Sequence, residues 1–236
     1  GESGLYANNS PRFGVVGLPY LYRDLAHWAS IVDGPIGAGL AVELQKSAGL
    51  RIMNWMIGGY RDTYSRTRAI RKPEDFAGMK LRLPEAPAFV RSFRALGAIP
   101  TPIPAPEVYS ALQTGVVDGA ENNPPTMLEH NHYQSAKYYS LTGHLILPEP
   151  LMMSKTTWNK LTPEQQALVK KLAKEAQLEE RELWTAKEKA SDEKLKAEGV
   201  EYIEVDTKPF YDATAPVRAK YGAQFADLIK RIEAVK

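Results

Sequence analysis

The sequence predicts an α/β fold with a mainly parallel sheet, followed by one very long helix. In the first half, short apolar runs alternate with stretches of helical spacing, which is the pattern of βα units. In the second half, nothing interrupts the helical pattern between residues 163 and 198. The 236 residues are 44% hydrophobic and 25% charged, so the chain has the composition of a globular protein with a substantial core.

Two strands and two helices are predicted before residue 60. The apolar run at residues 13–18 is typical of a buried strand. Asp24 is the predicted N-cap of a helix whose apolar residues recur at helical spacing, and residues 34–48 form a second helix. A second strand at residues 50–57 ends at a pair of glycines.

Three shorter strands follow. They are predicted at residues 79–83, 99–103 and 116–118, and helices at residues 86–96 and 107–113 separate them. Each helix is followed by a glycine that can end it with a left-handed backbone. This alternation indicates a mainly parallel sheet, because parallel neighbours need a crossover connection.

The long helix has a strong predicted start. Thr162 is the N-cap, Pro163 occupies the first helical position, and Gln165 stands three residues after the cap. About 35 residues at 1.5 Å per residue span roughly 52 Å, whereas a compact domain of this size is roughly 45 Å across. Its partial apolar stripe is compatible with a coiled coil, but favours a helix that lies across two lobes.

Composition excludes several functions. The net charge of +2 gives no electrostatic reason to expect nucleic acid, and the absence of cysteine excludes disulfides, thiolate metal sites and cysteine nucleophiles. No apolar run approaches the ~18 residues that span a bilayer. The chain begins at Gly1 without a signal segment, so we expect a mature or trimmed polypeptide.

Catalytic and metal-binding motifs are weak. His130 and His132 are spaced to chelate a metal, yet no third ligand is evident. Asp118 and Glu121 could form a carboxylate pair, but they flank a predicted turn and lack a partner motif. We therefore predict no metal and no cofactor, and we favour binding over catalysis. A lyase or hydrolase that uses the two carboxylates remains the alternative.

Two loops carry polar residues at the ends of predicted strands. Arg82 lies near the end of one strand, and Asn122 and Asn123 follow another. Open α/β sheets bind ligands at this edge, an arginine fork pairs both oxygens of a carboxylate, and asparagine both donates and accepts hydrogen bonds. Spacing alone favours a simpler interpretation, in which Arg82 is an exposed arginine and the asparagines cap a helix.

Ordered blocks between residues 59 and 122 carry a family signature. They read GYR at 59–61, DFAGMKLRLP at 75–84, LGA at 96–98, PTP at 100–102 and EVYSALQTGVVDGAEN at 107–122. Together they resemble the DctP-type solute-binding proteins, the periplasmic receptors of tripartite ATP-independent periplasmic (TRAP) transporters. The resemblance implies a two-lobe periplasmic binding protein fold in which both lobes close on an organic acid and a long helix spans them.

The resemblance also divides the chain. Residues 1–59 and 148–187 are assigned to lobe I, and residues 60–147 and 188–236 to lobe II, which carries the carboxylate-binding arginines. Members of the family begin with about two further βα units, so lobe I is expected to lack its N-terminal strands and helices here. We expect the native protein to extend further at the N-terminus.

A hinge is expected where the lobes meet. It is placed near residues 58–59 and 147–148, with the long helix bending near residues 186–189 as the lobes close.

Residue roles follow from the same resemblance. Arg82 matches the arginine that clamps the ligand carboxylate, Arg61 matches a supporting arginine, and Asn122 matches an asparagine that hydrogen-bonds the ligand. Ala105 stands where relatives often carry a bulky aromatic residue, so aromatic stacking is not expected there.

Further positions complete the predicted pocket. Glu121 and His144 match positions in its wall, and Glu2 matches an acidic residue of lobe I that can face the cleft. Glu85 and Asn123 lie in the surrounding loops and are suited to accept hydrogen bonds from hydroxyls. Glu85 is expected to be buried, where it would repel a second acid group, although it could instead only favour the start of the next helix.

The predicted ligand is a hexuronate, such as glucuronate or galacturonate. C4-dicarboxylates and other carboxylates are the alternatives, as is an enzyme or a sensor's partner built on the same fold. The expected partners are the carboxylate ligand and the membrane permease subunits, with no nucleic acid. We expect a periplasmic monomer.

Overall fold

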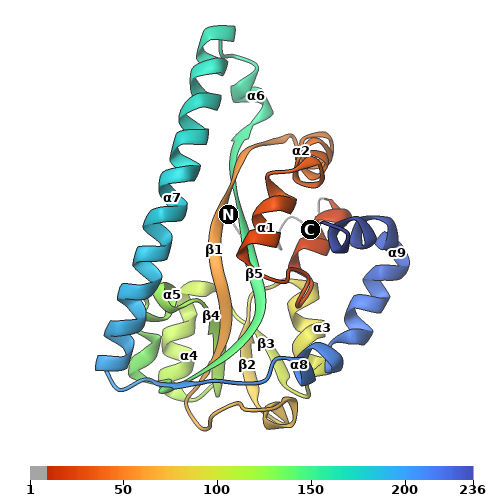
Figure 1. Cartoon of the computed structure of the whole chain (residues 1–236). Helices are drawn as coiled ribbons and strands as arrows, with labels where there is room; N and C mark the ends of the chain where they lie inside the picture. The colour runs from red at the N-terminus through yellow and green to blue at the C-terminus, as the bar shows by residue number, and fades with distance from the viewer. Residues whose placement is uncertain (1–9, 236) are drawn as a thin grey trace.

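A computed structural model describes residues 10–235 as one mixed six-stranded sheet with helices on both faces (Figure 1). The spatial order of the strands is β3-β2-β4-β1-β5-β6. In chain order they are β1 (Leu50–Ser65), β2 (Lys80–Leu83), β3 (Ile99–Pro102), β4 (Gly119–Asn122), β5 (Tyr138–Ser154) and β6 (Glu201–Ile203).

Nine α-helices are described in the same part of the chain. They are α1 (Leu25–Val32), α2 (Pro35–Ala48), α3 (Pro87–Ala95), α4 (Val108–Thr114), α5 (Pro124–Glu129), α6 (Lys155–Trp158), α7 (Pro163–Ala197), α8 (Lys208–Ala213) and α9 (Ala215–Glu233). None of these helices is both long enough and apolar enough to cross a lipid bilayer.

The sheet is mixed, whereas a mainly parallel sheet was expected. The two long strands β1 and β5 run antiparallel, from Leu50 opposite Ser154 to Ser65 opposite Tyr138, and β4 is also antiparallel to β1. Parallel pairing joins β2 to β3 and β4, and β5 to β6. The α/β fold is confirmed, but the two strands that cross the molecule run in opposite directions.

Three predicted elements differ in detail. The expected strand at residues 13–18 is a buried 3₁₀ helix, Pro11–Gly17, since a short apolar run signals burial without fixing the backbone. β1 does not end at its glycine pair but continues through it, with Gly59 at φ +68° beside a shift in register. The strand expected at residues 116–118 lies slightly later, as β4.

The long helix α7 is confirmed almost to the residue. The Thr162 hydroxyl accepts from the Gln165 amide at 3.3 Å, and the Gln165 side chain accepts from the Thr162 amide at 2.9 Å, which forms the predicted capping box. The helix passes alongside β1 from α6 at one end to α5 at the other (Figure 1).

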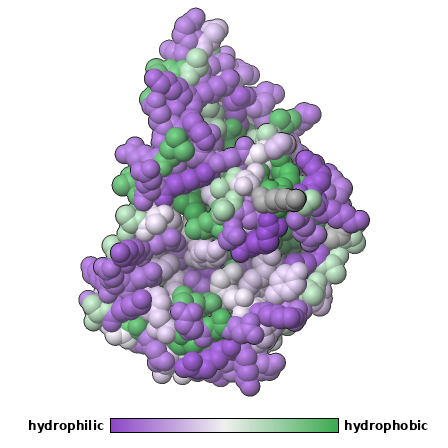
Figure 2. All heavy atoms as spheres, viewed as in Figure 1, coloured by the Kyte–Doolittle hydropathy of each residue, from purple (hydrophilic) through white to green (hydrophobic). Residues whose placement is uncertain are grey.

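Most of the large apolar side chains of α7 are not used for packing. Leu168, Leu172, Leu178 and Leu183 are all more than half exposed, at 54%, 51%, 54% and 62%. Figure 2 shows hydrophobic patches on the side of the molecule along which α7 runs. The first part of the predicted apolar stripe therefore faces outward, whereas Leu195 at its end is fully buried. The buried residues of the helix are Ala173, Gln177, Ser191 and Leu195.

The core is divided into three clusters. One joins β1 to α1, α2 and α9 around Phe13, Trp28 and Trp55. The other two cover opposite faces of the part of the sheet that contains β2 and β4, which we call the lower sheet. One is built around Phe76 and Phe93 and the other around Tyr64 and Tyr139. The lower sheet is therefore buried on both faces, so polar residues on its strands must find partners inside the protein.

Helix α2 offers a matched pair of glycines for a stability test. A Cβ atom on Gly37 would collide with the backbone of Val32, whereas one on Gly39 would meet nothing within 4 Å. We expect Gly37→Ala to lower the free energy of unfolding by about 1–3 kcal/mol. Gly39→Ala should be neutral or raise it by up to about 1 kcal/mol, since alanine favours helix. Urea unfolding measures both, and equal effects would contradict the close packing at Gly37.

Candidate functional site

Two of the predicted site residues lie where strands end and helices begin. Arg82 is the penultimate residue of β2, and α3 starts soon after it; Asn122 is the last residue of β4, directly ahead of α5. The two strands are parallel, with Arg82 in register with Ala120. This is the sheet edge at which open α/β folds bind ligands.

Arg61 and Glu121 form a buried ion pair at this edge. Arg61 Nε donates to Glu121 Oε2 at 2.6 Å and Arg61 Nη2 donates to Oε1 at 2.7 Å, while the two side chains are 1% and 0% exposed. The pairing of β1 with β4 brings them together, because Thr63 lies opposite Glu121. The guanidinium also lies over the ring of Phe89, 5.4 Å from its centroid. Such a two-pronged pair fixes geometry as well as charge.

His144 completes the cluster. Its Nε2 lies 3.1 Å from Glu121 Oε2, and its Nδ1 lies 3.0 Å from the Thr142 hydroxyl. Burial lowers the pKa of His144, although the hydrogen bond to Glu121 acts in the opposite direction. Burial alone would raise the pKa of Glu121, but the charge and hydrogen bonds of Arg61 outweigh it and lower that pKa to about 2. The cluster is therefore a cation and an anion that cancel, with a neutral imidazole beside them.

Arg82 leaves the sheet on the opposite face from Glu121. It is in register with Ala120, and successive side chains alternate between faces. Its side chain is buried, the residue being 6% exposed, and its Nε donates to the carbonyl oxygen of Ile103 at 2.8 Å. This bond holds the guanidinium beside the end of β3. That Arg61 assists Arg82 in clamping a ligand stays a prediction.

The two asparagines differ in what their side chains do. Asn123 Oδ1 accepts from the Thr126 amide at 2.9 Å and Nδ2 donates to Gly58 O at 2.8 Å, so both ends of its amide are engaged. The helix-cap interpretation therefore describes Asn123. Asn122 is half-buried, and its Oδ1 accepts from the Asn123 amide at 2.9 Å.

Two acidic residues of the predicted pocket have different outcomes. Glu85 is exposed, so the expectation of a buried carboxylate is wrong: the residue sits in the connection between β2 and α3, and such connections run over the surface. Glu2 lies outside the described residues.

The metal site and the catalytic carboxylate pair considered from the sequence gain no support from the geometry. The rings of His130 and His132 stack at 5.7 Å, but His132 Nδ1 is bonded to the Tyr64 hydroxyl at 2.8 Å. Within residues 10–235 no set of three His, Asp or Glu side chains is arranged to hold a metal. Asp118 accepts from the Lys80 amide at 2.8 Å, whereas Glu121 is committed to Arg61, so the two carboxylates have separate partners.

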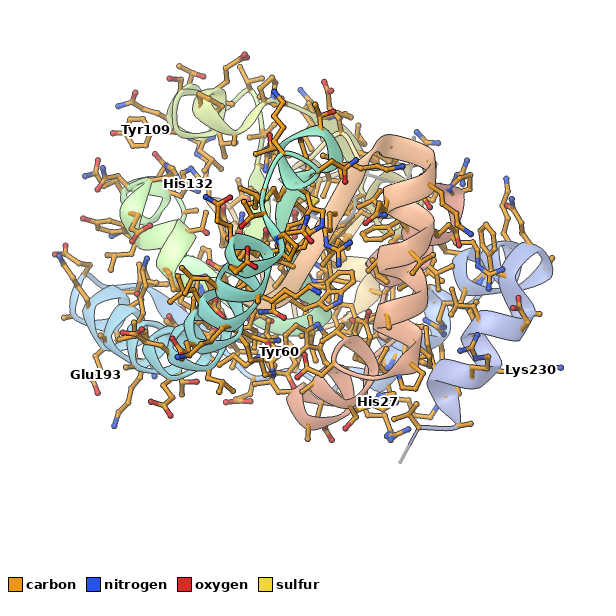
Figure 3. All side chains as sticks on the ribbon, turned by 90° about the horizontal axis from the view of Figure 1, so that it is seen from above. His27, Tyr60, Tyr109, His132, Glu193 and Lys230 are labelled. Carbon is orange, nitrogen blue, oxygen red and sulfur yellow. The ribbon has the colours of Figure 1, made fainter. Side chains whose placement is uncertain are left out.

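Asp62 is a buried polar residue that sequence reasoning missed. Its Oδ1 accepts from the Gly143 amide at 2.7 Å, and burial raises its pKa to about 7. It lines a hollow of about 270 Å³ between β1 and α7, together with Tyr60 and Glu188. Figure 3 shows Tyr60 near the centre of the molecule. An aspartate inside a strand that packs on both faces is the signal that could have found it.

Comparison with known proteins gives consistent matches. The model of the bacterial extracellular solute-binding proteins, family 7 (DctP), matches residues 2–224. A crystal structure of a TRAP periplasmic solute binding protein from Pseudomonas putida F1 with bound D-glucuronate is 57% identical; the match covers 100% of this chain and 77% of that one, with a TM-score of 0.96. The corresponding protein from Sulfitobacter sp. NAS-14.1, with bound β-D-galacturonate, is 38% identical, with 99% and 78% covered and a TM-score of 0.94.

A curated relative matches over a smaller share of its length. A solute-binding protein of Chromohalobacter salexigens is 36% identical over 203 residues. The match covers 86% of this chain but 60% of the relative, so the chain spans less than two thirds of that protein.

Proposed function

The chain belongs to family 7 of the bacterial extracellular solute-binding proteins, and on that premise we propose that it is the part of a TRAP receptor that captures a hexuronate. The observation that carries the proposal is the 57% identity, over the whole chain, to a protein whose structure holds D-glucuronate. Similar proteins with bound galacturonate support the same ligand class. The receptor works in the periplasm and delivers the acid to the permease subunits of its transporter.

Arg82, the buried arginine of β2, binds the carboxylate of the ligand in this proposal. A uronate carries one carboxylate, and the planar fork of Arg82 can donate two parallel hydrogen bonds to it. Asn122 lies on the neighbouring strand end and offers an amide to a ring hydroxyl. Arg61 takes a supporting part, held in one orientation by Glu121 and His144.

The architecture also supports closure of two lobes around the ligand. In the described part of the chain we assign residues 10–59 and 148–187 to lobe I, and residues 60–147 and 188–235 to lobe II. The β1–β5 ladder connects them, and its register shifts between Ile57 and Tyr60, beside the proposed hinge. A ladder interrupted at this point can bend there while both lobes keep their own packing.

Capture without catalysis is the proposed activity. The carboxylates that an enzyme would need are committed elsewhere, Glu121 to Arg61 and Asp118 to a backbone amide. A uronate incubated with the protein should therefore be recovered unchanged.

The ligand class is tested by thermal unfolding and calorimetry with D-glucuronate, D-galacturonate, succinate and D-glucose. Ligand at 100 times its Kd stabilises the folded state by about 2.7 kcal/mol. For a chain of this size that stabilisation raises Tm by roughly 5–11 °C. We expect this shift with either uronate. Glucose is the matched control, because it differs from glucuronate only in a hydroxymethyl group in place of the carboxylate, and it should give no shift. Stabilisation by succinate but by neither uronate would overturn the proposal.

A further inference from the structure

Strand β5 makes a large bulge beside the buried ion pair of Arg61 and Glu121. Arg61 of β1 pairs with Leu145 of β5, but Thr63 pairs with Ser140, so residues 141–144 of β5 lie opposite Asp62 alone. We call residues 141–144 the β5 bulge. A segment displaced from its ladder needs other hydrogen-bond partners, because unpaired buried backbone groups are strongly unfavourable.

Tyr20 supplies two of these partners from a distant part of the chain. Its backbone N–H donates to His144 O at 3.0 Å, and its hydroxyl donates to Thr142 O at 3.0 Å. Asp62 holds the bulge from the other side, by accepting from the Gly143 amide at 2.7 Å. The β5 bulge is therefore gripped between β1 and the segment that precedes α1.

The backbone of Tyr20 is in an unusual conformation. It has φ +56°, in the left-handed region, which is unfavourable for a residue other than glycine. Strain of this kind persists where the surroundings impose it, and it is found preferentially at functional sites. Here the conformation lets the amide and the hydroxyl of one residue reach two carbonyl groups of the same bulge.

The β5 bulge contacts the Arg61–Glu121 ion pair through His144. The Glu121 carboxylate accepts hydrogen bonds only, so His144 Nε2 must carry the proton that it donates. In a neutral ring Nδ1 is then an acceptor, and the Thr142 hydroxyl donates to it at 3.0 Å. The Thr142 hydroxyl lies in turn 3.3 Å from that of Thr63.

We propose that Tyr20 is a positioning residue for the predicted anion site of Arg82 and Arg61: by clamping the β5 bulge it fixes the orientation of His144, and through Glu121 the orientation of Arg61. Tyr20 touches neither the ligand carboxylate nor Arg82 in this role. The inference rests on the proposed function for its affinity readout, but its spectroscopic readout does not depend on any ligand.

The chain provides a matched control two residues away. The hydroxyl of Tyr22 is buried and has no hydrogen-bond partner among the described residues. Tyr20→Phe and Tyr22→Phe therefore both remove a phenolic hydroxyl, but only Tyr20→Phe removes a hydrogen bond to the β5 bulge. For Tyr20→Phe we expect affinity for D-glucuronate to fall by about 3- to 10-fold, the usual effect of one lost hydrogen bond. Tyr22→Phe should leave affinity unchanged.

The second readout is the ¹⁵N spectrum of the His144 ring in histidine-labelled protein, with the signal assigned from its loss in His144→Gln. Wild type and Tyr22→Phe should show one neutral tautomer with the proton on Nε2. Tyr20→Phe should show a shifted signal. Thr142→Val should do the same, and Thr142→Ser, which restores the hydroxyl, should recover the wild-type spectrum.

Each outcome has one meaning. If Tyr20→Phe matches Tyr22→Phe in both affinity and spectrum, the clamp is wrong. If wild type binds no uronate while the His144 spectrum still responds to Tyr20→Phe, the proposed function fails and the clamp stands. If Tyr20→Phe does not fold, the two Thr142 variants carry the test, and identical spectra for them would overturn the proposal.

Discussion

Replacing Arg82 by alanine is expected to weaken binding of D-glucuronate at least tenfold while the protein remains folded. A guanidinium that pairs with a buried carboxylate makes charge-assisted hydrogen bonds, and removal of one partner costs about 2–5 kcal/mol. Arg82→Lys should also weaken binding, because an ammonium group cannot reproduce the planar fork. Isothermal calorimetry gives the affinity, and circular dichroism checks the fold.

The control for this loss is Arg94→Ala. Arg94 is an exposed arginine on α3, so its removal changes the net charge equally without touching the strand ends. Its affinity for glucuronate should equal that of the wild type. Unchanged binding by Arg82→Ala would show that Arg82 does not bind the ligand carboxylate.

The largest effect on stability is expected from Glu121→Gln. This change keeps the shape of the side chain but leaves the Arg61 guanidinium buried without its counter-charge. Breaking a buried ion pair by removing one partner costs about 3–5 kcal/mol. For a chain of this size the corresponding fall in Tm is roughly 6–20 °C. Glu129→Gln is the matched control, because Glu129 pairs with Lys187 at 2.6 Å on the surface, where the side chains are 56% and 46% exposed.

The same pair gives the stability of the protein a defined dependence on pH. The pKa of Glu121 is lowered from 4.5 to about 2 in the folded state, so the unfolded state binds more protons between these values. The contribution of Glu121 is therefore complete above pH 4.5 and is lost as the pH falls toward 2. Urea unfolding from pH 7 to pH 2.5 should show a steeper loss for wild type than for Glu121→Gln. Parallel curves would show that the ion pair contributes nothing in this range.

Local signals made the helices predictable. The cap and proline at the start of α7 are adjacent in sequence, and α7 begins and ends where that pattern predicts. Glycine after α2 and α4 likewise marks their ends, with Gly49 and Gly115 at φ +65° and +76°. Strand direction has no comparable local signal, and so the antiparallel course of β5 beside β1 could not be read from alternation of elements.

The candidate site was harder to predict than the fold. The roles of Arg82 and Asn122 came from the family resemblance, because spacing alone favoured a simpler interpretation; each does lie near the end of its own strand, and both roles stay predictions. The partners of Arg61 and Asp62 come from β4 and β5, dozens of residues away, and only the pairing of strands reveals them. Burial of Glu85 was wrongly expected, because sequence does not show which side of a connection faces the solvent.

The ladder of β1 and β5 also has a consequence for how the chain folds. Ser65 pairs with Tyr138 and Leu50 pairs with Ser154, so the paired residues of β1 and β5 lie between 73 and 104 positions apart in the sequence. Contacts this far apart in sequence slow folding, because the intervening loop must close before any of them forms. During synthesis β1 therefore remains an open edge while the segments that follow it emerge. Since its two strands run through both proposed lobes, neither lobe has a complete sheet until the ladder closes, so we expect the folding of the two lobes to be coupled.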